Sequence, residues 1–148
     1  LLNRMFFRLS RQIHRIHTGE LGAHSRMVEL FVSEDLVPRG KGKNGPGHRE
    51  HVVPCAFLRD ACLRKFSEGA SIDDVAVWIR PYIVIVDITK IQQRHLDDSL
   101  NNGGCGLKTT MPVGWSFNKG CIFERLHVAG IEFDPPQGMP ICDHEVSG

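Results

Sequence analysis

A run of six residues, Ile83-Val84-Ile85-Val86-Asp87-Ile88, is apolar and β-branched apart from its aspartate. Such a run is typical of a buried strand, because β-branched side chains pack well on a pleated surface. A second short strand is predicted at Glu50-His51-Val52-Val53-Pro54, where the proline stops it. Most other periodic segments are helical, and they span residues 3–17, 21–31, 55–69, 72–79, 90–100 and 122–129. The sequence therefore predicts a helix-rich α+β fold with a small β-hairpin or sheet.

The length of 148 residues is close to the commonest size of one domain, and 41% hydrophobic with 24% charged residues argues against disorder. We expect a single domain over residues 1–148, made of a helical hairpin (1–37), a basic Gly/Pro-rich loop (38–49), a core (50–134) and a frayed tail (135–148). Arginines interrupt the N-terminal apolar residues too early for a signal peptide, and no apolar stretch reaches the roughly 18 residues that cross a membrane.

The five cysteines lie at positions 55, 62, 105, 121 and 142 and form no Cys-x-x-Cys pair. This spacing supports neither a zinc ribbon nor a thioredoxin-like motif. Buried, reduced cysteines are common in proteins of reducing compartments. We therefore expect five thiols and a cytoplasmic location.

Charge is distributed unevenly along the chain. Residues 1–49 contain nine Lys/Arg and four Asp/Glu, whereas residues 50–148 contain nine and thirteen. Within residues 38–49, four glycines and two prolines indicate a loop, because these residues do not sustain a helix. The loop supplies the residues that we expect to contact nucleic-acid phosphates, which are Arg39, Lys41, Lys43, His48 and Arg49.

The segment after this loop carries the most function-like motif. Glu50-His51-Val52-Val53-Pro54 is followed by the strand at residues 83–88 and by a helix that opens with Thr89-Lys90. This arrangement resembles the HNH, or ββα-metal, endonuclease family. Its first strand carries an acidic residue, a histidine, two β-branched residues and proline. Its second strand leads into a helix that supplies a further metal ligand. The resemblance covers about fifty residues in these segments.

The resemblance implies a phosphodiesterase site. Glu50 would be a metal ligand and His51 the general base, with His48 nearby to assist it. Gln93 and His95 of the helix are the other candidate ligands, for Mg²⁺, Mn²⁺ or Zn²⁺. The chain departs from the family in four ways. Gln93 stands where His or Asn is usual, and His95 lies about 200° further round the helix. The connector at residues 55–82 is long, and valines replace the structural Asn that is usual near the second strand.

Two functional hypotheses follow. The first is a metal-dependent HNH-like endonuclease, or a degenerate nucleic-acid-binding relative. The second is a non-enzymatic, self-associating accessory protein, of the kind carried on mobile gene cassettes. In that case His51 is hydrogen-bonded in a core, and Glu50 pairs with an arginine such as Arg49 or Arg39. The N-terminal amphipathic helices and the region of Trp115 then form a homodimer interface.

Overall fold

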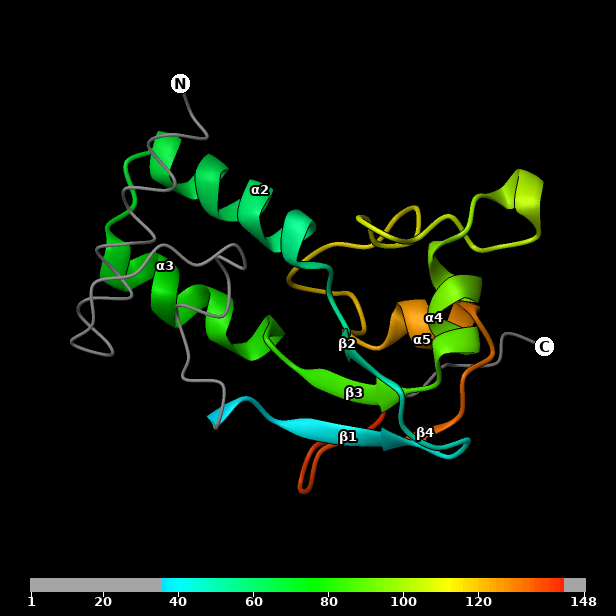
Figure 1. Ribbon diagram of the computed structural model, residues 1–148. Helices are drawn as coiled ribbons and strands as arrows, with labels where there is room; N and C mark the ends of the chain where they lie inside the picture. Colours follow the sequence, from blue (N-terminus) through cyan, green and yellow to red (C-terminus); the bar gives the residue numbers. More distant parts are fainter. Residues whose placement is uncertain (1–35, 143–148) are drawn as a thin grey trace, which may run out of the picture. The chain divides into compact units, whose positions relative to one another are not determined.

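The computed structural model describes residues 36–142 (Figure 1). The helices predicted at residues 3–17 and 21–31 lie outside these residues, as does the end of the predicted tail. The chain divides into two compact units, and the described parts are residues 36–37 with 54–83, and residues 38–53 with 84–142. Among residues 36–142, no helix combines the length and the apolar character needed to cross a membrane.

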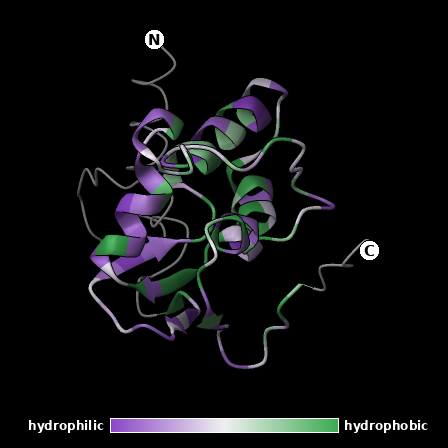
Figure 2. Cartoon of the chain, turned by 90° about the vertical axis from the view of Figure 1, so that its right-hand side faces the viewer, coloured by the Kyte–Doolittle hydropathy of each residue, from purple (hydrophilic) through white to green (hydrophobic). Residues whose placement is uncertain are grey.

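The first unit is helical. It contains α2 (Cys55–Ser67), α3 (Ile72–Ile79) and a 3-10 turn at Arg80–Tyr82. Ser71 caps α3, because its side chain accepts a hydrogen bond of 3.1 Å from the backbone N–H of Asp74. The buried side chains of the two helices are Leu58, Ala61, Cys62, Val75, Ala76 and Ile79. Figure 2 shows hydrophilic and hydrophobic residues along the same helical ribbons, as expected for amphipathic helices.

The second unit contains a four-stranded mixed sheet, which confirms the α+β prediction. Its strands are β1 (Arg39–Gly42), β2 (His48–His51), β3 (Ile85–Ile88) and β4 (Phe133–Asp134). Their order is β2-β3-β1-β4, with β1 parallel to β3, and with β2 and β4 antiparallel to their neighbours β3 and β1. Figure 1 shows β1 and β3 side by side. Residues 85–88 of the predicted run therefore form β3, the strand between β1 and β2.

The prediction that residues 38–49 form a loop is wrong, because both ends of this segment are strands. Its glycines allow close approach of backbones. A Cβ at Gly40 would lie 2.5 Å from the carbonyl oxygen of Asp134, and one at Gly42 would lie 2.8 Å from that of Asp87. Glycine at these positions thus serves strand packing, and the turn is confined to residues 43–47.

Two helices complete the second unit, α4 (Lys90–Asp97) and α5 (Glu124–Val128), with a 3-10 turn at Leu100–Asn102. Thr89 and Gln92 form a capping box at the start of α4, with hydrogen bonds of 3.0 and 3.1 Å. The helix ends earlier than its predicted limit of residue 100, because Asp98 is extended and the following loop folds back. Leu96 is buried, whereas Ile91 and Leu100 are exposed.

A disulfide joins Cys121 and Cys142, whose Cα atoms are 5.7 Å apart. The prediction that all five cysteines are reduced is therefore wrong for this pair. The spacing of 21 residues gives no local signal for the bond, which forms because the chain beyond β4 returns to the segment before α5. The same bond holds residues 135–142, which were predicted to fray, to the second unit.

Candidate functional site

The second unit contains two antiparallel strands followed by a helix. β2 pairs with β3 through His48↔Ile88, Arg49↔Asp87, Glu50↔Val86 and His51↔Ile85. From the end of β3 the chain enters α4 through the Thr89 cap, and α4 packs against β2. The sequence between β2 and β3 forms the helices of the first unit. The spatial order strand, antiparallel strand, helix is thus present despite the long connector.

The carboxylate of Glu50 is buried between two nitrogen donors. Its exposed fraction is 7%, and Arg125 on α5 is fully buried at 0%. Nη1 of Arg125 donates to Oε1 of Glu50 over 2.9 Å. Nε2 of His48 lies 2.8 Å from Oε2. Each carboxylate oxygen therefore has its own partner, and the guanidinium compensates the buried negative charge.

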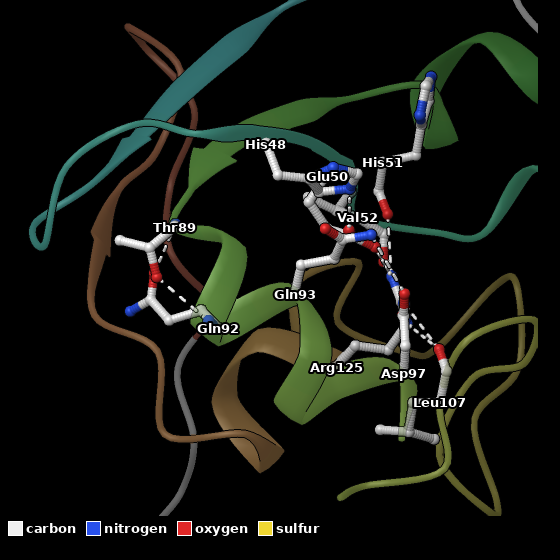
Figure 3. A network of polar contacts seen from close by, with 10 residues as sticks. All are labelled: His48, Glu50, His51, Val52, Thr89, Gln92, Gln93, Asp97, Leu107 and Arg125. Atoms are coloured by element: carbon white, nitrogen blue, oxygen red, sulfur yellow. Dashed lines mark hydrogen bonds and ion pairs between the residues drawn. The ribbon is translucent and has the colours of Figure 1, made fainter. Parts of the chain in front are cut away.

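Arg125 also holds the end of β2 against a distant loop (Figure 3). Nε and Nη2 both donate to the carbonyl oxygen of Leu107, over 2.9 and 2.6 Å. Nη1 donates further to the carbonyl oxygens of His51 (2.9 Å) and Val52 (3.4 Å). One guanidinium thereby satisfies three backbone carbonyls and a carboxylate in the interior, where unsatisfied polar groups are costly.

Arg125 is not among the residues predicted from the sequence, although a signal for it is present. The arginine stands between Phe123, which precedes α5 as its N-cap, and Leu126 within the helix, and both are fully buried. Its large apolar neighbours are the signal, because an arginine packed among them becomes a buried cation that needs an acceptor. Nothing local in the sequence identifies Glu50 as that acceptor, because 75 residues separate the two.

His51 and Glu50 do not converge on one site. The pairing of β2 with β3 is regular through both residues, and successive side chains of a strand point to opposite faces. Figure 3 shows the ring of His51 directed away from the Glu50 carboxylate. Their convergence on one site would need a bend of the strand between them, and β2 has none. His48 instead shares the face of Glu50, because it lies two residues before it.

The three predicted metal ligands have separate partners. Glu50 is held by Arg125 and His48, and the amide of Gln93 donates to Asp97 over 3.4 Å. Nε2 of His95 lies 3.5 Å from Sγ of Cys105. Within residues 36–142, no three His, Cys, Asp or Glu side chains are grouped so as to hold a metal ion. The donor set as placed does not fit the cation that the HNH resemblance implies, because its one carboxylate is neutralised by a guanidinium.

Basic residues gather on the opposite face of the sheet from Glu50. Two rows of paired residues cross β1, β3 and β2 in that order. One row is Lys41, Asp87 and Arg49, and the other is Arg39, Ile85 and His51. Paired residues of adjacent strands present their side chains to the same face. We call this the basic face; its exposed basic residues are Arg39, Lys41, Arg49 and, in the following turn, Lys43.

Two features limit the positive charge of the basic face. Asp87 lies between Lys41 and Arg49, and Asp134 of β4 pairs with Lys41 on its other side.

Of the five residues predicted to contact nucleic acid, His48 is turned to the opposite face and held by Glu50. The remaining four are exposed.

No protein-family model, curated protein or solved structure matches this chain.

Proposed function

We propose that this protein binds nucleic acid through the phosphate backbone, and that its two-strand-and-helix element is a binding scaffold without hydrolytic activity. The observation that carries the lack of hydrolysis is the buried Glu50–Arg125 ion pair, at 2.9 Å, within an element whose order resembles that of the ββα-metal family. On this proposal the two-strand-and-helix element serves binding, while the carboxylate that a metal ion would need is held by Arg125 and maintains the fold.

The energetics favour a structural role for Glu50. Removing one partner of a buried ion pair costs about 3 to 5 kcal/mol, because the other charge is left in the interior. A metal ion at Glu50 would have to displace the guanidinium, which also holds Leu107 and His51 through their carbonyl oxygens. A general base must also reach the reacting water, and His51 lies on the other face of the sheet from Glu50.

The basic face supports binding of phosphates. Lysine and arginine side chains that protrude from neighbouring strands form a positive surface that needs no base-specific contact. With Asp87 and Asp134 beside them, the four basic residues correspond to about two to four phosphate contacts. We therefore expect weak binding that depends on salt and little on sequence.

Binding is measured by the fluorescence anisotropy of a labelled DNA duplex. For about three phosphate contacts, the association constant is expected to fall about 40-fold between 50 and 200 mM salt. In the variant Lys41→Gln/Lys43→Gln, affinity is expected to fall, and the slope of log K against log salt to decrease by about 1.8.

The matched control is Lys108→Gln/Lys119→Gln, which removes two exposed lysines of the same unit outside the sheet. It is expected to bind like the parent. If both double variants lost the same amount of affinity for DNA, binding would respond to net charge alone. That result would contradict an interface on the basic face. Absence of binding by the parent at 50 mM salt would overturn the proposal itself.

A plasmid-nicking assay with Mg²⁺ or Mn²⁺ tests for hydrolysis. We expect the parent to cleave no faster than His51→Ala or Glu50→Gln. Cleavage that the parent performs and His51→Ala loses, with the thermal unfolding of the two proteins equal, would establish an enzyme and refute the scaffold proposal.

A further inference from the structure

A thiol and an imidazole meet at the C-terminal end of α4. Sγ of Cys105 lies 3.5 Å from Nε2 of His95, within hydrogen-bonding distance for sulfur. His95 is exposed, and Cys105 is partly exposed and outside any disulfide. The two groups have no part in the Glu50 network or in the basic face, and a solute can reach both.

The backbone fixes this pair. The N–H of Cys105 donates to the carbonyl oxygen of His95 over 2.8 Å, and the N–H of Leu107 donates to that of Leu96 over 2.9 Å. Gly104 allows the loop to lie against Asp98, because a Cβ at position 104 would meet the Asp98 carbonyl group. The loop at residues 98–107 therefore places the thiol beside the imidazole by several backbone contacts.

We propose that Cys105 is a site of reversible modification by small-molecule disulfides, with His95 as the proton acceptor. The Sγ–H proton moves to Nε2 of His95 while Sγ forms a bond to one sulfur of the disulfide. The S–S bond of that molecule breaks, and its second sulfur leaves as a thiolate that takes the proton from His95. One disulfide is exchanged for another, so the step needs no further oxidant.

The other described cysteines differ from Cys105. Cys121 and Cys142 are already joined to each other. Cys62 is fully buried, and this burial raises the pKa of its thiol from 9.0 to about 12, so its nucleophilic thiolate is scarce at neutral pH. Cys55 lies in the first turn of α2. Cys105 is the partly exposed thiol of the second unit with an imidazole as neighbour, and we expect it to react first.

The test uses 4,4′-dithiodipyridine, a neutral disulfide that releases a coloured thiopyridone, at pH 7 with the folded protein. Samples taken early are digested and mapped by mass spectrometry. We expect the first adduct on Cys105, its removal by dithiothreitol, and its absence in Cys105→Ser. His95→Gln is expected to slow the reaction of Cys105 about tenfold, because the thiol then loses its proton acceptor.

Arg94→Gln is the control, since it changes the adjacent exposed residue and keeps the imidazole. In Arg94→Gln, the rate at which Cys105 reacts is expected to match that in the parent. In His95→Gln, the rate at which Cys55 reacts is likewise expected to match that in the parent. Equal unfolding temperatures show that both variants fold. First reaction at Cys55 or Cys62, or an unchanged Cys105 rate in His95→Gln, would overturn the proposal.

Discussion

Replacing Arg125 with methionine is expected to lower the free energy of unfolding of the second unit by about 3 to 5 kcal/mol. The side chain is fully buried, and its guanidinium compensates the carboxylate of Glu50 at 2.9 Å. Methionine fills a similar volume but donates no hydrogen bond. The variant therefore leaves a buried carboxylate with His48 alone, and it leaves the carbonyl oxygen of Leu107 without its two donors.

The measurement is urea unfolding in a Trp78→Phe background, in which Trp115 is the remaining tryptophan and reports on the second unit. Arg94→Met is the control: the same exchange at an exposed position of α4 is expected to change stability by less than about 0.5 kcal/mol. A loss below about 1 kcal/mol for Arg125→Met would show that the buried ion pair does not hold the fold as inferred.

A double-mutant cycle separates the ion pair from the other hydrogen bonds of Arg125. Glu50→Gln alone leaves a buried cation, whereas Glu50→Gln combined with Arg125→Met removes both charges. The double variant is expected to be more stable than the sum of the single losses predicts, by about 1 to 3 kcal/mol. Strict additivity would contradict direct coupling between the two side chains.

The sequence predicts those parts of the fold that depend on near neighbours. Ser71 and Thr89, which directly precede two predicted helices, cap α3 and α4, and each N-cap bond joins residues only three apart. The buried strand also forms within its predicted residues. At residues 38–49 the same local rules fail, since glycine is typical both of a loop and of two backbones in close approach. Pairing with β3 decides between a loop and a strand, and β3 lies more than forty residues further along the chain.

In the candidate site, too, the sequence predicts local features but not contacts between distant residues. The motif identifies Glu50 as an unusual residue, and the structure shows that its carboxylate is buried. The identity of its partner depends on a contact across 75 residues, which no local pattern encodes. The alternation of a regular strand already predicts that Glu50 and His51 diverge, and only a bend in β2 would bring them together. The regular pairing with β3 shows that no such bend forms within β2.

Loss of the Cys121–Cys142 disulfide is expected to reduce the stability of the second unit by about 3 kcal/mol. The bond closes a segment of 21 residues, and a cross-link of this length removes about that much conformational entropy from the unfolded chain. Trp115 is a suitable reporter because its Nε1 donates to the carbonyl oxygen of Cys121 over 2.8 Å.

Cys121→Ser, Cys142→Ser and the reduced parent should unfold at the same lower urea concentration, since each lacks the same cross-link. Cys55→Ser is the matched control and should unfold like the oxidised parent, because Cys55 is outside the disulfide. Equal stability of the oxidised and reduced parent would contradict a stabilising bond. If the serine variants are destabilised more than the reduced parent, the cysteine side chains contribute packing beyond the cross-link, because reduction keeps both sulfur atoms in place.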